Sequence, residues 1–164
     1  LDAFSYLGSD VKVQNLSDDG LQDDRVYKTF FEQISAGTPI SEISDCPDLG
    51  PILVALAALK NGATFMATDR LKIKESDRGG AMHEELKKLG GGLVFGDNAI
   101  TVPKQTLQFN GTALSGHNDH RIVMAMSVIL SKTGGTIEGV QAVGKSYPGF
   151  FEDIMYLGAE VTLQ

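Results

Sequence analysis

An internal repeat constrains the fold of this chain more than any other feature of its sequence. Residues 48–59 (DLGPILVALAAL) and 119–130 (DHRIVMAMSVIL) both begin with aspartate, continue as an apolar run and lie 71 positions apart. The agreement extends to a Gly-x-Thr motif at 62–64 and 134–136, where the offset is 72 positions. Such self-similarity indicates a repeated structural unit, whose copies bury their apolar faces against one another.

Each copy is predicted to contain two helices of different character. Residues 50–60 and 121–131 are apolar on nearly every side, which is typical of helices buried in a core. The second helix of each copy has one apolar stripe, which is typical of a helix on the surface. The stripes comprise Met82, Leu86 and Leu89 in one copy and Phe150 or Phe151, Ile154 and Leu157 in the other, with Glu84, Glu85, Lys87 and Asp153 expected outside.

Short strands and glycine turns are expected between these helices. A strand follows each buried helix, and residues 93–95 and 100–102 are predicted to pair as a hairpin through 96–98. Gly90 and Gly158 stand where a helix end favours a left-handed residue. Each copy is therefore predicted as helix, strand, second helix and final strand.

The front of the chain contains a third, partial copy. Residues 1–7 are similar to the end of a buried helix, 11–16 to a strand and 24–34 to a second helix. We predict an α/β (α+β) fold with a pseudo-threefold arrangement, in which buried helices at the centre are surrounded by small sheets and outer helices. Because the first copy lacks its beginning, we expect its N-terminal partner strand to lie outside this sequence. The single domain, residues 1–164, then has a partial first unit (1–45), a second unit (46–115) and a third unit (116–164).

The composition excludes several classes of protein. The 164 residues have a net charge of −7, with ten of the 21 acidic residues among the first 48. A general affinity for nucleic acid or for acidic membranes is therefore not expected. No apolar run is long enough for a transmembrane helix. The single cysteine, Cys46, excludes a disulfide framework and favours a cytoplasmic location.

No metal or cofactor is expected from the motifs. His117-x-x-His120 and His83-Glu84 fall short of zinc-binding motifs. A dinucleotide-binding fingerprint lies between a first strand and a helix, whereas the glycines at 90–92 follow a predicted helix, so we reject a Rossmann domain. Nucleotide hydrolysis has no support either, because the chain contains no glycine-rich loop that ends in Lys-Ser or Lys-Thr.

Asp48 and Asp119 occupy equivalent positions at the starts of the two predicted buried helices. A carboxylate at such a position can accept hydrogen bonds from free N–H groups and complements the positive end of the helix dipole. One interpretation is therefore a pair of N-terminal caps, and the other is a pair of acidic site residues.

Four cations lie where a helix dipole disfavours them. Lys74 and Lys145 occupy the links from a strand to an outer helix, Arg78 follows Lys74 by four residues, and Arg121 lies in the first turn of its buried helix. Helix N-termini and arginine side chains together bind carboxylates and phosphates well. The pattern predicts an anion site at which these cations have no counter-charge from the protein.

Two further side chains are candidates for acid–base chemistry. Glu75 follows Lys74 directly, where it either donates a proton or neutralises Lys74 or Arg78. His120, which follows Asp119, is either a proton carrier or a packed polar group. The residues alone leave both alternatives open.

Four ordered blocks of the sequence resemble the signature motifs of the 5-enolpyruvylshikimate-3-phosphate synthase family, in its C-terminal domain. They are 45–51 (DCPDLGP), 71–78 (LKIKESDR), 118–126 (NDHRIVMAM) and 145–152 (KSYPGFFE). The resemblance implies a transferase of two domains, each built of three similar units, which closes over its substrates at facing helix N-termini. It implies transfer of the enolpyruvyl group of phosphoenolpyruvate to shikimate 3-phosphate, with release of phosphate, in chorismate and aromatic amino-acid biosynthesis. The family is the target of glyphosate.

The resemblance also implies roles for individual residues. By motif position, Asp48 takes the proton of the accepting hydroxyl and Glu75 protonates the methylene of phosphoenolpyruvate. Lys74 contacts shikimate 3-phosphate. The remaining residues divide into the phosphoenolpyruvate ligands Arg78, Arg121 and Lys145 and the supporting residues Asp119 and His120.

Two alternatives accompany this reading. The sister enolpyruvyl transferase that acts on UDP-N-acetylglucosamine shares the fold and chemistry, but the Lys-Glu-Ser-Asp-Arg and Asp-His-Arg motifs favour shikimate 3-phosphate. A non-catalytic anion-binding module is the second alternative. Without the partner domain half of the site is missing, so we expect the fragment alone to be inactive. Arg70 stands where some family members have an amide that holds shikimate, and its role stays open.

Overall fold

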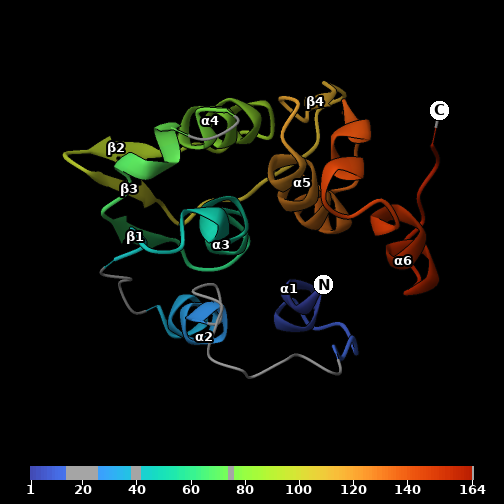
Figure 1. The fold of residues 1–164 in the computed structure, drawn as a ribbon, viewed down its shortest axis with the longest axis horizontal. Helices are drawn as coiled ribbons and strands as arrows, with labels where there is room; N and C mark the ends of the chain where they lie inside the picture. The colour runs from blue at the N-terminus through green and yellow to red at the C-terminus, as the bar shows by residue number, and fades with distance from the viewer. Residues whose placement is uncertain (14–25, 38–41, 74–75, 164) are drawn as a thin grey trace.

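The computed structural model describes residues 1–13, 26–37, 42–73 and 76–163. Two helices occupy its centre. These helices, α3 (Gly50–Leu59) and α5 (His120–Thr133), lie side by side (Figure 1). Eight of the ten residues of α3 are buried, as expected of a helix with apolar residues on every side. The predicted buried helices are therefore confirmed.

The outer helices surround this pair. In the view of Figure 1, α4 lies above α3, α1 and α2 lie below it, and α6 lies beyond α5 near the C-terminus. Met82 and Leu86 on α4 and Ile154 on α6 are buried, as their stripes predict. The bounds of these helices are Asp2–Tyr6 for α1, Tyr27–Ala36 for α2, Arg78–Lys88 for α4 and Phe150–Tyr156 for α6.

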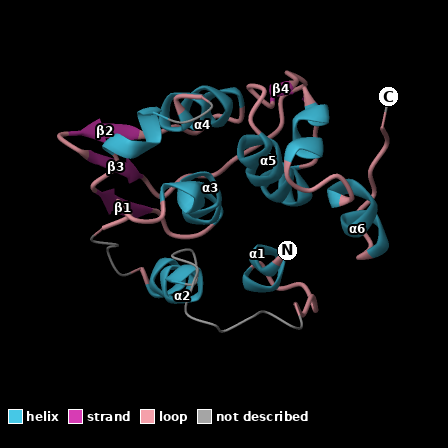
Figure 2. Ribbon diagram, viewed as in Figure 1, coloured by secondary structure: helices cyan, strands magenta, loops and turns pink. Residues whose placement is uncertain are grey.

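Two small sheets complete the architecture (Figure 2). β1 (Ala63–Met66), β2 (Val94–Gly96) and β3 (Ala99–Val102) form an antiparallel sheet in the order β1-β3-β2, which includes the predicted hairpin. β4 (Leu114–Ser115) and β5 (Ile137–Glu138) form a parallel pair. Short 3-10 turns at Pro47–Leu49, Asp69–Ile73 and Val140–Lys145 link these elements.

Helices and small sheets around a helical core agree with the predicted α/β class. The main apolar cluster joins α3 and α5 to α4 and the three-stranded sheet, and a second cluster packs the other side of α5 against α6. Among the described helices, none is both long and apolar enough to cross a membrane.

Four details of the repeat differ from expectation. Glu85, predicted to lie outside, is buried with an exposed fraction of 1%, and Leu157, predicted to pack inside, is 43% exposed. Residues 159–163 form no closing strand after α6, and residues 11–13 form no strand in the first copy. The rest of that predicted strand, 14–16, lies outside the described residues. Helical periodicity identifies the face that packs on the core, but it does not register a neighbour that packs on the side of the helix.

Candidate active site

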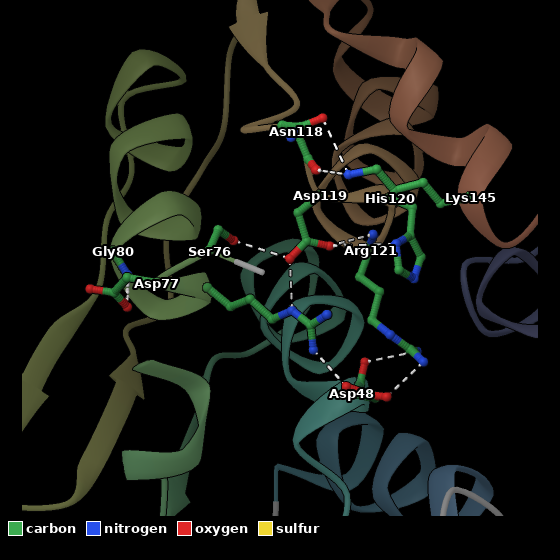
Figure 3. A network of polar contacts seen from close by, with 10 residues as sticks. Asp48, Ser76, Asp77, Gly80, Asn118, Asp119, His120, Arg121 and Lys145 are labelled. Atoms are coloured by element: carbon green, nitrogen blue, oxygen red, sulfur yellow. Dashed lines mark hydrogen bonds and ion pairs between the residues drawn. The ribbon is translucent and has the colours of Figure 1, made fainter. Parts of the chain in front are cut away.

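Four charged side chains meet beside the starts of the central helices. Asp48 lies in the 3-10 turn before α3, Arg78 opens α4, Asp119 directly precedes α5, and Arg121 lies in its first turn. In Figure 3 the side chain of Arg121 points toward Asp48, and the carboxylate of Asp119 lies beside the backbone nitrogen of Arg121. The fold thus joins residues as far as 73 positions apart.

Asp119 forms the buried centre of this cluster. Its Oδ1 accepts a hydrogen bond from the backbone N–H of Arg121 at 2.9 Å, so it caps α5 as one of the two interpretations predicts. Its Oδ2 accepts from Ser76 Oγ at 3.1 Å and from Arg78 Nε at 2.8 Å. Burial by itself raises the pKa of Asp119, but the hydrogen bonds from Arg78 and Arg121 outweigh it and hold the pKa below its ordinary value.

Arg78 connects the two aspartates. Its side chain is only 1% exposed, with Nη1 at 2.6 Å from Asp48 Oδ1 and Nε bound to Asp119. Burial by itself lowers the pKa of the guanidinium, but the hydrogen bonds to Asp119 and Asp48 raise it above its ordinary value. Because a buried charge needs such partners, Arg78 is fixed in position as well as in charge.

Asp48 and Arg121 form the more accessible side of the cluster. Arg121 Nη2 lies 2.9 Å from Asp48 Oδ2, and Nη1 donates to the backbone carbonyl of Asp48 at 3.2 Å. The exposed fractions of these two side chains are 33% for Asp48 and 28% for Arg121. An incoming ligand can therefore reach this pair, whereas Arg78 and Asp119 lie behind it.

Lys145 and His120 border the cluster (Figure 3). Lys145 Nζ donates to the backbone carbonyl of Asn118 at 2.9 Å and to its Oδ1 at 3.3 Å. The Nδ1 of His120 lies 4.0 Å from Asp119 Oδ1 and, within the described part of the chain, makes no hydrogen bond although it is buried. The side chain of Lys145 is exposed, and both oxygens of Asn118 that accept its hydrogen bonds are uncharged. Its positive charge can therefore bind an anion.

Two predictions about this cluster are wrong in part. The cations were expected to have no counter-charge from the protein, yet Arg78 is paired with both aspartates and Arg121 with Asp48. Asp48 was one of two expected helix caps, but α3 has Leu49 at its N-cap position and no side-chain capping bond. The reason is tertiary: once the helix starts converge, carboxylates and guanidinium groups satisfy each other.

Four further residues belong to the 70–78 segment. Lys74 and Glu75 lie outside the described residues. Asp77 is the N-cap of α4 and accepts from the N–H of Gly80 at 3.1 Å. Arg70, whose role was open, donates from Nη1 to the carbonyl of Ser44 at 2.7 Å.

An apolar cavity of about 410 Å³ adjoins the cluster. Asp48 and Arg121 lie in its wall, next to the aromatic rings of Tyr147 and Phe150. Most of the lining is apolar, so the cavity places an apolar surface directly beside the accessible ion pair.

Sequence reasoning missed Ser76, Asn118 and Glu85. Ser76 and Asn118 each lie within one of the four sequence motifs, so the neighbouring motif residues could have indicated them. Nothing in the sequence around Glu85 indicated that it is buried and hydrogen-bonded. Of the residues that the structure describes, Glu84, Glu85 and His117 are the one group whose ligand atoms, all within 4.8 Å of one another, could hold a metal ion.

Comparison with known proteins identifies a family for most of this chain. The model of the EPSP synthase (3-phosphoshikimate 1-carboxyvinyltransferase) family matches residues 6–154. A 3-phosphoshikimate 1-carboxyvinyltransferase of Clostridium kluyveri is 35% identical over 177 aligned residues, which cover 94% of this chain and 41% of that protein. One from Halorubrum lacusprofundi is 37% identical, covering 73% of this chain and 27% of that protein.

A solved structure also resembles the fold. The EPSP synthase of Acinetobacter baumannii superposes with a TM-score of 0.62 at 30% identity, covering 71% of this chain and 28% of that one. The chain thus spans about 40% of the length of the clostridial relatives that it matches over nearly its whole length.

Proposed function

The chain belongs to the EPSP synthase family, and we propose that it supplies the C-terminal part of the active site of a 3-phosphoshikimate 1-carboxyvinyltransferase. In this proposal the whole enzyme moves the enolpyruvyl group of phosphoenolpyruvate to shikimate 3-phosphate and releases phosphate. The N-terminal domain supplies the other walls of the site, and the cytoplasm is the location. The observation that carries the proposal is the convergence of Asp48, Arg78, Asp119 and Arg121 within the matched region.

The accessible ion pair suits the binding of an anionic substrate. Arg121 is partly exposed and already directed at Asp48. A phosphate or carboxylate competes with Asp48 for this guanidinium, because an arginine fork binds either kind of oxygen pair. Lys145, held by Asn118, adds a second cation from a different element. Phosphoenolpyruvate carries both anionic groups and therefore matches this pair of cations.

The same exchange bears on acid–base chemistry. When an anion takes Arg121, Asp48 loses one of its cationic neighbours, and its affinity for a proton rises. That change prepares Asp48 to accept the proton of the hydroxyl that is being substituted. Arg78 keeps the carboxylate oriented, since it is buried and also bound to Asp119. The roles of Lys74 as a contact of shikimate 3-phosphate and of Glu75 as proton donor are part of the proposal by motif position.

A titration with phosphoenolpyruvate tests the binding half of the proposal. In ¹H–¹⁵N spectra of the 164-residue chain, we expect weak, saturable shifts at Arg121, Lys145 and the 76–78 segment. Arg121→Gln is expected to abolish most of these shifts, while Lys104→Gln, a change outside the cluster, preserves them. Shifts spread over unrelated lysines would contradict a single anion site.

A chimera tests the catalytic half. This chain replaces the matching segment of the Clostridium kluyveri protein, and phosphate release is measured with phosphoenolpyruvate and shikimate 3-phosphate. We expect turnover by the chimera, none by the fragment alone, and a far larger loss in kcat than in substrate affinity for Glu75→Gln. Turnover with UDP-N-acetylglucosamine in place of shikimate 3-phosphate would favour the sister enzyme. Anion binding without turnover of either acceptor would favour a non-catalytic module.

A further inference from the structure

The carboxylate of Glu85 is buried outside the cluster and has several partners. Its Oε2 accepts from the backbone N–H of Ser115 at 2.8 Å and lies 2.9 Å from Lys88 Nζ. Its Oε1 lies 2.7 Å from Nε2 of His117. Since an ionised carboxylate only accepts, Nε2 of His117 is the donor. A buried charge with this set of partners fixes the groups around it.

These contacts complete the open edge of strand β4. On one edge, the N–H groups of Leu114 and Gly116 donate to the carbonyls of Thr136 and Glu138. The alternate residues face the other way, as in any strand. There Lys88 Nζ donates to the carbonyl of Ala113 at 3.4 Å, and Glu85 accepts from Ser115. Two side chains of α4 thus take the place of a neighbouring strand.

The turn that follows β4 has an unusual backbone. His117 and Asn118 both have positive φ angles, 48° and 53°. Such angles are uncommon for residues other than glycine, although Asn and His adopt them more readily than most, and two in succession mark a tight turn. Glu85 holds the ring of His117, and Lys145 holds Asn118. The next residue of the chain is Asp119, the centre of the candidate site.

Helix α4 contacts this turn at both of its ends. Arg78 binds Asp119 after the turn, and Glu85 binds Ser115 and His117 before and within it. Arg78 and Glu85 are seven residues apart, two helical turns, so they lie on one face of α4. We propose that Glu85 is a positioning residue of the site: by clamping β4 and His117 to α4, it sets where Asn118 and Asp119 meet Lys145 and Arg78. Its importance for substrate binding rests on the proposed function.

A metal site at the same place is the weaker interpretation. The ligand atoms of Glu84, Glu85 and His117 lie close together. However, Lys88 already places its ammonium within 3.0 Å of both oxygens of Glu85. A metal ion there would have to displace this cation and the hydrogen bond from Ser115.

Glu85→Gln tests the proposal, with Glu84→Gln as the matched control. Glutamine keeps the shape but turns an NH₂ group toward two of the three donors that Glu85 accepts from, namely Lys88 and either Ser115 or His117. Glu84 is the adjacent residue on α4; its side chain is 69% exposed, and its Oε2 lies 3.9 Å from His117 Nε2, which is beyond hydrogen-bond distance. We expect Glu85→Gln to shift the amide signals of 117–121 and to speed hydrogen exchange at Arg78 Nε–H, because the turn that places Asp119 against Arg78 loses its support. Glu84→Gln leaves both unchanged.

One outcome overturns the proposal: Glu85→Gln lowers the Tm, but its Arg78 Nε–H exchange and its 117–121 amide signals are the same as in Glu84→Gln. That result would show that Glu85 only stabilises the fold. If Glu85→Gln does not fold, His117→Ala serves instead, since His117 is partly exposed. Unchanged Arg78 Nε–H exchange in that variant also overturns the proposal.

Phosphoenolpyruvate affinity is expected to fall about tenfold in Glu85→Gln. If the unmodified chain does not bind phosphoenolpyruvate, the proposed function fails, while Arg78 exchange still decides the positioning role.

Discussion

The two aspartates at equivalent places in the repeat have different structural roles. Asp119 is fully buried and caps α5 through the N–H of Arg121. Asp48 is one-third exposed and directs its carboxylate at two arginines, while the cap position of α3 belongs to Leu49. Equivalent positions in the repeat therefore differ in role: Asp119 both caps its helix and forms part of the candidate site, whereas Asp48 belongs to the site without occupying the cap position of α3.

The two helices start at different distances from their aspartates. α5 begins at His120, directly after Asp119, whereas α3 begins at Gly50, two residues after Asp48. Asp119 also has the extended backbone typical of a cap, with φ −120° and ψ 117°. Asp48 instead lies within a 3-10 turn. The start of α3 therefore lies farther from Asp48, whose carboxylate lies against Arg78 and Arg121.

Asp119→Ala is expected to give the largest effect of the four changes that test this comparison. It removes the cap and leaves the buried Arg78 with an incomplete set of partners, at a cost of about 3–5 kcal/mol in the free energy of unfolding. Urea denaturation with circular dichroism measures this cost. A loss below about 1 kcal/mol would show that solvent reaches Arg78 and that Asp119 is not the structural member of the pair.

Acid titration sharpens the same contrast. The folded state lowers the pKa of Asp119 below its ordinary value of 3.8. A lowered pKa in the folded state means that the charged form stabilises the fold above the pKa of the unfolded chain, and that this contribution disappears as the pH falls through the folded pKa. The difference in stability between the unmodified chain and Asp119→Asn should therefore be constant near neutral pH and shrink below about pH 4. A difference that persists in acid would assign the loss to packing.

Asp48→Ala should have a smaller effect on stability. Asp48 is partly exposed, and Arg78 keeps its bond to Asp119 in this variant. Loss of hydrogen bonds to charged partners predicts about 1–3 kcal/mol. The same urea experiment measures the loss, and Asp45→Ala, a nearby acidic position outside the cluster, is its control. A loss equal to that of Asp119→Ala would remove the distinction between the two aspartates.

Arg121→Ala should affect stability least and anion binding most. Its ion pair with Asp48 is partly exposed, and such pairs contribute no more than about 1 kcal/mol. Calorimetry is expected to show a nearly unchanged Tm, while phosphoenolpyruvate titration shows lost binding. A large fall in Tm with binding retained would reverse the assignment and make Arg121 structural.

The fold was more predictable than the site. The buried helices and the hairpin follow from local apolar patterns, which the structure confirms. Glu85 shows where this reasoning fails: its spacing on α4 indicates an outer face, yet β4 packs there and the carboxylate meets Ser115 and His117. Leu157 fails in the opposite sense, because α6 ends at Tyr156 and Leu157 is exposed.

By itself, the sequence determined the central helices, the outer helices and the residue types gathered at the helix starts, because these depend on neighbours three or four positions away or on recognisable motifs. Only the tertiary structure decided that Arg78 is shared by two aspartates, that Asp48 faces Arg121 and that Glu85 supports the turn before Asp119. These partners are 30 to 73 positions apart. Which carboxylate a buried guanidinium binds depends on how whole helices pack against one another. No local sequence pattern specifies this packing.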